Sequence, residues 1–275
     1  MPVITFWSNN EKAIGQTVAA SVVSTVTAIE HNYKVLLISA DLNNRIIERS
    51  FGAHESNRDI VKGIVQKAQI NFDSGINGLL KLSESNRITP EVIHDYTKII
   101  FNNRLDILAS PVNIADERQF LEDIKNIIIN ASRYYDYVFV DLKKGLRYNE
   151  QVEILNLSDV IVLNTDQRIE SIENLLNEKE IKRIYSKVIW NICRNDKNSK
   201  YNSKNLSRKI LKKESIHEID YNTLVSEATQ EGGIPELMLR FRTLREDHEN
   251  MEFVSKVKKI IEAILLKYRE VHSGM

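Results

Sequence analysis

The stretch that decides the fold is Val3-Ile-Thr-Phe-Trp-Ser-Asn-Asn-Glu-Lys-Ala-Ile-Gly-Gln-Thr17, followed directly by Val18-Ala-Ala-Ser-Val-Val-Ser-Thr-Val-Thr-Ala-Ile29. The run from Val3 to Trp7 is short and mostly apolar, as expected of a buried strand, and a small polar loop follows it. Residues 18–29 are rich in Ala, Val and Ser and contain neither Gly nor Pro, so an uninterrupted helix can form. We therefore predict a strand, a loop and a helix in direct succession.

The loop of this unit matches the phosphate-binding P-loop motif at two of its four defining positions. The P-loop motif G-x-x-x-x-G-K-[ST] uses glycines to turn backbone N–H groups toward phosphate, a lysine to neutralise charge and a hydroxyl to hold Mg²⁺. Asn10 stands in place of the first glycine, and Gly15 keeps the second. Gln16 replaces the lysine, whereas Thr17 keeps the hydroxyl. Taken alone, these residues also fit an ordinary turn between a strand and a helix.

Length and composition limit the class of protein. The 275 residues, of which 42% are hydrophobic, suffice for one large α/β domain, and we expect a single domain over 1–275. Lys+Arg and Asp+Glu balance at 38 each, so no overall field favours nucleic acid and we expect no nucleic-acid partner. A single Cys193 excludes a disulfide framework within the chain.

The N-terminus and the apolar runs bear on location. Met-Pro-Val-Ile-Thr-Phe lacks the basic and apolar regions of a signal peptide, so we expect a cytoplasmic protein. No apolar run approaches the roughly 20 residues that span a bilayer. Any contact with a membrane or cell pole is therefore expected to be peripheral.

Two apolar runs end in an acidic residue. Lys34-Val-Leu-Leu-Ile-Ser-Ala-Asp41 and Tyr135-Asp-Tyr-Val-Phe-Val-Asp141 both have the pattern of parallel strands buried on both faces. Further strands are predicted over 105–109, 160–163, 187–191 and 216–220, and helices over 60–69, 90–101, 116–132, 169–179 and 251–269. This alternation predicts an α/β fold with a doubly wound, mostly parallel sheet flanked by helices. Asp41 and Asp141 then lie at the carboxyl edge of the sheet, where ligands bind in such folds.

The whole chain resembles the MinD/ParA family of deviant P-loop ATPases, in which the loop reads K-G-G-x-G-K-[ST]. This sequence keeps Gly15 and Thr17 but lacks both lysines, and Glu11 stands at the family's signature lysine. Four further segments are similar to family landmarks: 35–41 to V-L-L-I-D-x-D, 135–145 to the Walker B segment Y-D-Y-V-I-I-D-x-P-x-G, 188–191 to the strand whose terminal Asn reads adenine, and 219–232 to I-P-Y-D…EA…G.

The resemblance implies roles for individual residues. Asp41 would position the attacking water, and Asn191 would read adenine. ATP would contact Glu11, Lys12, Gly15, Gln16, Thr17, Asp141 and Asn191, and Mg²⁺ would contact Thr17, Asp41 and Asp141. Simpler interpretations stay open, because either aspartate can cap a helix, Thr17 can be an ordinary first-turn residue, and Asn191 can cap a strand end.

The resemblance also implies partners and a process. Family members dimerise face to face over nucleotide and recruit other proteins, so we expect a homodimer and a protein partner. The segment from Gly78 to Pro111 is most similar to the TadZ/CpaE-like branch, which acts in pilus assembly and localisation. We therefore expect a scaffold or localisation factor in pilus or secretion assembly.

Loss of both lysines predicts weak or absent ATP hydrolysis. A charge-assisted hydrogen bond to phosphate is worth about 1.5–3 kcal/mol, and catalysis of phosphoryl transfer is almost entirely positioning and electrostatics. We therefore expect ATP and Mg²⁺ to bind weakly or not at all. The alternative is a slow ATPase for partitioning or positioning, in which Lys12, Lys143 or Lys144 replaces the missing charge. Lys143 and Lys144 also fit a solvated turn.

The C-terminal segment has a helical apolar stripe opposite a basic face. The stripe contains Phe253, Val254, Val257, Ile260, Ile261, Ile264 and Leu265, and the basic face contains Lys256, Lys258, Lys259 and Lys267. Such a helix can lie in a membrane interface or pack on its own sheet. Acidic residues dilute the basic face, so we expect packing.

Overall fold

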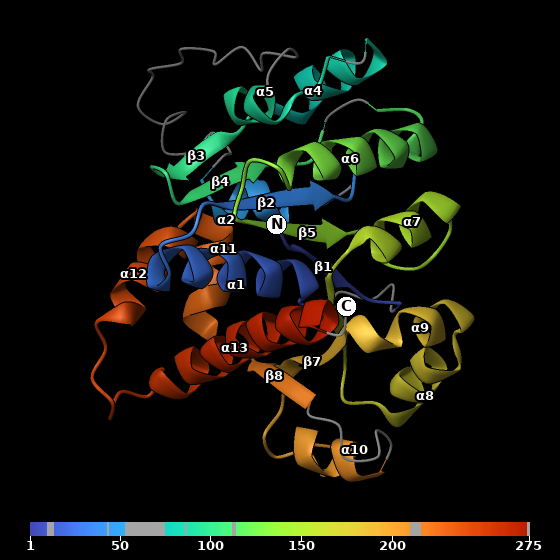
Figure 1. The fold of residues 1–275 in the computed structure, drawn as a ribbon. Coiled ribbons are helices and arrows are strands. Elements are labelled where there is room, and N and C mark those ends of the chain that lie inside the picture. Colours follow the sequence, from blue (N-terminus) through green and yellow to red (C-terminus); the bar gives the residue numbers. More distant parts are fainter. Residues whose placement is uncertain are drawn as a thin grey trace.

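An eight-stranded sheet forms the centre of the computed structural model, which describes residues 1–9, 14–42, 44–52, 75–85, 87–111, 114–209 and 216–273. Within these ranges the strand order is β3-β4-β2-β5-β1-β6-β7-β8 (Figure 1). Neighbouring strands are parallel except β3 and β4. The strands are β1 (Val3–Trp7), β2 (Val35–Ala40), β3 (Lys98–Phe101), β4 (Leu105–Leu108), β5 (Tyr137–Leu142), β6 (Val160–Thr165), β7 (Val188–Asn195) and β8 (Ile216–Asp220).

Helices cover both faces of the sheet, which confirms the predicted doubly wound α/β fold (Figure 1). One core lies under α4 (Gly75–Glu84), α5 (Pro90–Asp95), α6 (Glu117–Ala131), α7 (Asn149–Leu157), α8 (Ile169–Asn177), α9 (Lys179–Ile184) and α10 (Ser203–Lys209). The opposite core lies under α1 (Gln16–Glu30), α2 (Ile46–Ser50), α11 (Thr223–Glu231), α12 (Ile234–Arg242) and α13 (Met251–Ser273). A short 3₁₀ turn, η1 (Tyr185–Lys187), leads into β7.

The predicted strand–loop–helix unit is present as β1 and α1. Gly15 lies directly before α1 with a φ of 95°, a left-handed conformation that glycine adopts without strain. Hydroxyl groups inside this buried helix bond to the preceding turn: Ser21 donates to the Thr17 carbonyl at 2.9 Å, and Thr25 donates to the Ser21 carbonyl at 2.7 Å. A helix rich in Ser and Thr can therefore pack on the sheet without unsatisfied hydroxyls.

Two predicted elements need correction, and one cannot be compared. The predicted helix over 90–101 ends at Asp95, because residues 98–101 pair with β4 as the antiparallel strand β3. The predicted strand over 187–191 continues to Asn195, so Asn191 is not its last residue. The predicted helix over 60–69 lies outside the described residues.

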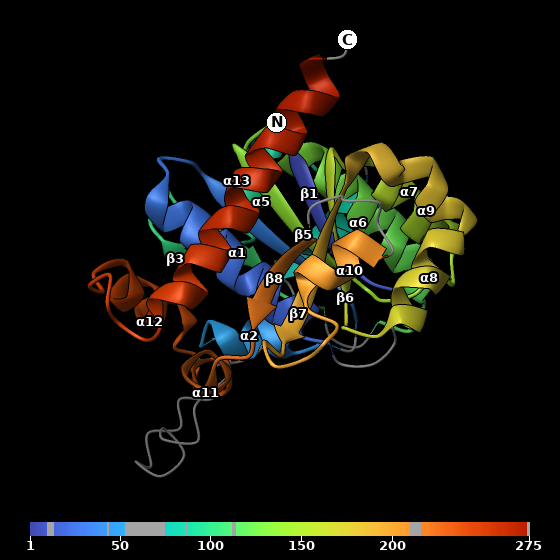
Figure 2. The same cartoon turned by 90° about the horizontal axis from the view of Figure 1, so that it is seen from below.

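Helix α13 packs on the molecule as expected. Its apolar stripe is buried against α1 and the β6–β8 region, while its C-terminal end projects beyond the sheet (Figure 2). Lys256, which was expected on the basic face of this helix, is largely buried: its ammonium group pairs with Glu218 at 2.6 Å and Asp220 at 2.7 Å on the edge strand β8. None of the helices in the described ranges has both the length and the apolar character needed to cross a bilayer.

Candidate functional site

The carboxyl edge of the sheet brings the P-loop and the two predicted aspartates into one region. Phe6 of β1 is in register with Asp141 of β5, and Ser39 of β2 is in register with Asp141 on its other side. Asp41 follows the last residue of β2. Parallel pairing therefore places the start of α1, Asp41 and Asp141 at neighbouring strand ends, as predicted.

Gln16, at the position of the P-loop lysine, turns its side chain inward. Its Nε2 atom donates hydrogen bonds to Asp141 Oδ1 at 2.7 Å, to the Leu142 carbonyl at 2.8 Å and to the Phe6 carbonyl at 3.2 Å. Only 2% of the residue is exposed. At this position the P-loop motif has a lysine whose charge contacts phosphate. Here a neutral amide takes its place and is hydrogen-bonded to the ends of β1 and β5.

Asp141 is a buried carboxylate with one available oxygen. The residue is 1% exposed, and its Oδ2 atom accepts no hydrogen bond from the described residues. Burial raises the pKa of Asp141 to about 6, although the Thr17 hydroxyl and the Gln16 amide act to lower it. The negative charge of Asp41 raises this pKa further. Asp141 is therefore mostly ionised at neutral pH, with an acceptor that can take a cation or a water.

Thr17 reaches the same site, and its hydroxyl oxygen accepts one hydrogen bond there. The Asn44 Nδ2 atom donates a hydrogen bond to Thr17 Oγ1 at 2.6 Å. Asn44 lies in the short connection from β2 to α2, beyond Asp41. No sequence pattern predicts this contact, because Asn44 and Thr17 are 27 positions apart and an Asn is common in a polar connection.

The residues predicted to hold Mg²⁺ fit the ion only in part. Asp141 Oδ2 is a suitable acceptor for the ion or its water shell, but the Thr17 hydroxyl oxygen accepts from Asn44. Asp41 lies at the end of β2, and the described ranges contain no group of three or more His, Cys, Asp or Glu residues that could form a metal site. Mg²⁺ at nucleotide sites is typically held by one or two carboxylates together with water and phosphate oxygens, so Asp141 and Thr17 would supply only part of its shell.

Asn191 lies inside the sheet. It is fully buried in the middle of β7, where its Nδ2 atom donates to Asn164 Oδ1 at 2.8 Å and to Cys193 Sγ at 3.3 Å. Asn195 occupies the end of the strand instead. The adenine-reading role implied for Asn191 stays a prediction, and this side chain is committed to the sheet interior.

The turn after β5 contains the two lysines considered as substitutes. Gln151 holds this turn, because its Nε2 atom donates to the Lys143 carbonyl at 3.0 Å and to the Gly145 carbonyl at 3.1 Å. Lys143 forms an ion pair with Glu117 of α6. The charge of Lys144, in contrast, lowers the pKa of Asp141 and so acts on the site. Glu11 and Lys12, the remaining predicted contacts, lie outside the described residues.

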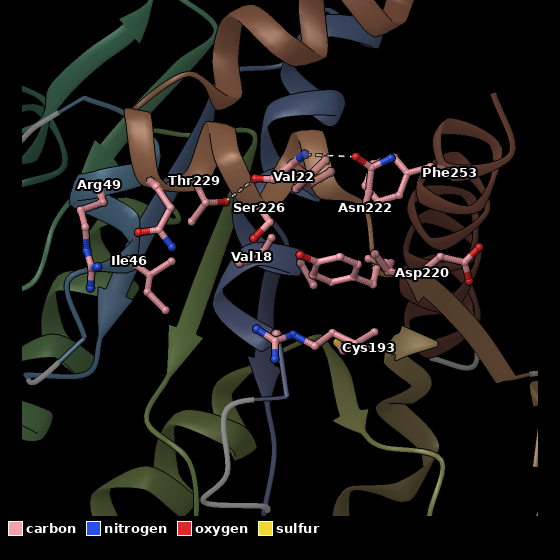
Figure 3. Close-up of a pocket in the computed structure, with 17 residues that line it drawn as sticks. Val18, Val22, Ile46, Arg49, Cys193, Asp220, Asn222, Ser226, Thr229 and Phe253 are labelled. Atoms are coloured by element: carbon pink, nitrogen blue, oxygen red, sulfur yellow. Dashed lines mark hydrogen bonds between the residues drawn. The ribbon is translucent and has the colours of Figure 1, made fainter. Parts of the chain in front are cut away.

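A cavity of about 190 Å³ opens beside Gly15, between α1, α2, α11 and the end of β8 (Figure 3). Apolar side chains of Val18, Val22 and Phe253 line it, and Arg49 and Arg194 add positive charge. The sequence did not identify this cavity, because its walls come from segments far apart in the chain.

Arg194 has an unusual backbone conformation within this wall. Its φ of 53° is left-handed, and a Cβ on Gly15 would lie 3.5 Å from the Arg194 Cγ. Gln167 secures the next two residues, since its Nε2 atom donates to Asn195 Oδ1 at 2.8 Å and its Oε1 atom accepts from the Asp196 N–H at 2.8 Å. The β7 end is thus held against the P-loop, with a cation over its glycine.

Comparisons with known proteins agree with this architecture. The chain matches no protein-family model, and no curated protein matches it in sequence. The cell division ATPase MinD of Pyrococcus furiosus superposes with a TM-score of 0.65 at 16% identity, over 96% of this chain and 99% of that one. A putative plasmid partition protein of Borrelia burgdorferi, bound to AMPPNP, gives 0.61 at 18% identity over 96% and 99%. The MinC:MinD cell division complex of Aquifex aeolicus gives 0.63 at 19% identity over 95% and 96%. The chain therefore has the fold of the MinD/ParA-type P-loop ATPases.

Proposed function

We propose that this chain is a degenerate MinD/ParA-like protein that does not hydrolyse ATP and acts as a scaffold or localisation factor. One observation carries the proposal: the Gln16 amide, at the lysine position, is hydrogen-bonded to Asp141 at 2.7 Å. In phosphoryl transfer the lysine and metal neutralise the charge that develops on the phosphate. A neutral side chain that faces the strand ends supplies no such charge.

Nearby contacts support the loss of hydrolysis. Lys143 is paired with Glu117, and the Thr17 oxygen accepts a hydrogen bond from Asn44. The remaining electrostatics of the loop are unfavourable for phosphate, because Glu11 adds a carboxylate where the family has a lysine. In this proposal ATP binds weakly, through the N-terminus of α1 and the cations Lys144 and Arg194.

Protein contacts replace catalysis in this proposal. A structural neighbour forms a complex with another protein, MinC, and the segment from Gly78 to Pro111 is similar to pilus-assembly proteins of the TadZ/CpaE-like branch. We propose a homodimer that binds a protein partner during pilus or secretion assembly, in the cytoplasm or at a membrane or cell pole. Because the family's bridging lysine is Glu11 here, dimerisation is independent of ATP; sedimentation with and without Mg²⁺-ATP tests this point.

Turnover measurements test the proposal directly. The purified chain should release phosphate from Mg²⁺-ATP no faster than the buffer does. Asp41→Ala is the reference variant, since it removes the residue at the water-positioning place. Turnover by the unmodified chain that Asp41→Ala abolishes would refute the loss of hydrolysis.

The second candidate function is a slow ATPase that uses Lys144. It is favoured by one observation, that the Lys144 charge acts on Asp141 within the site. Under this alternative Lys144→Ala would abolish turnover and Lys143→Ala would not. Equal, background rates for both variants and for the unmodified chain favour the scaffold.

A further inference from the structure

Two side-chain amides donate hydrogen bonds to oxygens that a metal ion would use. Gln16 Nε2 donates to Asp141 Oδ1 at 2.7 Å, and Asn44 Nδ2 donates to Thr17 Oγ1 at 2.6 Å. An amide N–H₂ group carries partial positive charge on its hydrogens, so it satisfies these oxygens as a cation would, without being a cation. Gln16 stands at the position of the P-loop lysine, whereas Asn44 lies outside the P-loop motif.

The orientation of Asn44 is fixed by its other contacts. Its Oδ1 atom accepts the backbone N–H of Ile46 at 3.0 Å, which leaves the Nδ2 atom to face Thr17. Its backbone carbonyl accepts from the Ser110 hydroxyl at 2.8 Å, and the same hydroxyl lies 2.8 Å from the Asp41 carbonyl. The Oδ1 atom, the Nδ2 atom and the backbone carbonyl of Asn44 therefore each have a hydrogen-bond partner.

The surrounding connection is held as well. Arg45 donates to the Ser110 carbonyl at 2.9 Å and to the Pro111 carbonyl at 3.1 Å. Ser110 itself is buried and also bonds to Ser39 at 2.6 Å. Two segments far apart in sequence thus fix the position of Asn44, and moving its amide away from Thr17 would disturb several hydrogen bonds together.

We propose that Asn44 is a specificity-determining residue that keeps divalent cations out of this P-loop, so that the site operates without metal. The proposal deepens, and rests on, the proposed loss of hydrolysis. A metal ion approaching Thr17 meets the amide hydrogens, and Mg²⁺ requires ligand oxygens at about 2.0–2.1 Å in an octahedral shell. Asp141 Oδ2 remains as an acceptor, so the exclusion of the ion depends on the Asn44 amide and not on a lack of carboxylate oxygen.

Direct metal binding tests the proposal without nucleotide or turnover. The probe is Mn²⁺, followed by the electron paramagnetic resonance signal of the free ion. Unmodified protein should show no saturable binding at the site. Asn44→Asp keeps an acceptor for the Ile46 N–H but replaces the donor with a carboxylate oxygen, so Mn²⁺ affinity should rise at least about tenfold. Mn²⁺ should also raise the Tm of this variant.

Matched variants make the result specific. Asn130→Asp adds the same charge at a half-buried position near the end of α6, away from the site. The Asn130 amide bonds only to the Asn126 carbonyl among the described residues, and this variant should behave like the unmodified chain. Asn44→Ala frees the Thr17 oxygen without adding charge and should show a smaller gain. Should Asn44→Asp fail to fold, Asn44→Ala decides the question.

Two results overturn the proposal. Saturable Mn²⁺ binding by the unmodified chain that Asp141→Asn removes would show that Asn44 does not exclude metal. Folded Asn44 variants without any gain would show that something other than Asn44 prevents binding. Neither result touches the proposed loss of hydrolysis, which is measured separately as phosphate release.

Discussion

Gln16 Nε2 lies 2.7 Å from Asp141 Oδ1, so the residue at the P-loop lysine position is bound to the buried aspartate near the end of β5. A hydrogen bond from a neutral donor to a carboxylate is worth about 1.5–3 kcal/mol. The same amide also bonds to the Leu142 carbonyl, which ties α1 to the end of β5. These contacts fix Gln16, at the start of α1, to the carboxyl edge of the sheet.

Restoring both lysines should restore nucleotide affinity. Gln16→Lys together with Glu11→Lys replaces a neutral and a negative side chain by two cations, and we expect ATP to bind about tenfold to a hundredfold more tightly. Isothermal titration calorimetry with Mg²⁺-ATP measures the change. Gln119→Lys, on the exposed surface of α6, is the control for added charge. An affinity unchanged from that of the unmodified chain would contradict the role assigned to these positions.

Stability should depend on pH through Asp141. Burial raises the pKa of this group from an ordinary 3.8 to about 6, so the folded state binds its proton more tightly than the unfolded state does. Between these values the folded state carries more protons, and the free energy of unfolding falls as pH rises. Ionising the buried carboxylate therefore costs folding stability at neutral pH.

The neutral variant Asp141→Asn should remove this pH dependence. We expect its free energy of unfolding at pH 7 to exceed that of the unmodified chain by up to about 3 kcal/mol, the order of magnitude of a two-unit shift in pKa. Urea denaturation at pH 5 and pH 8 measures both proteins. A variant that is less stable at pH 8 would show that the charged carboxylate contributes favourably to the fold.

Lys256 should contribute strongly to stability. Its side chain is 12% exposed and pairs with Glu218, Asp220 and Glu252 at 2.6, 2.7 and 3.2 Å. Lys256→Met leaves Glu218 without this cation and Asp220 with only Lys197 at 3.5 Å, and we expect a loss of about 3 kcal/mol. Lys258→Met on the same helix is the matched control, because that side chain is 42% exposed and its partner Glu30 is 3.3 Å away. Equal losses in Tm for the two variants would be inconsistent with this argument.

The sequence predicted the strands and the P-loop unit because continuous apolar runs and the spacing of Gly15 and Thr17 are local signals. It missed β3, since residues 98–101 continue a helical pattern and become a strand only by pairing with β4. The ion pairs of Lys256 were not predicted for a similar reason, because its acidic partners lie 36 and 38 positions earlier, on an edge strand. Contacts such as Asn44 to Thr17 depend on how separate segments fold together, and no local pattern reports them.

Removing α13 should destabilise the whole fold. The helix buries six large apolar side chains, Phe253, Val254, Val257, Ile260, Ile261 and Ile264, against the α1 side of the sheet. Burial of such a side chain stabilises a protein by about 1.5–3 kcal/mol. The summed contribution of the six side chains is therefore comparable with the whole free energy of unfolding of a domain, which is about 5–15 kcal/mol. Deleting residues 252–275 also removes Lys256 from Glu218 and Asp220.

A chain lacking residues 252–275 should therefore fail to fold or melt far below the full chain in circular dichroism. Leu266→Ala is the control, because that side chain is 56% exposed and its removal leaves the buried stripe intact. Binding to anionic liposomes should be measured on both proteins. If the truncated chain keeps its Tm and loses only liposome binding, the helix serves as a membrane anchor and its packing on the sheet is not required for folding.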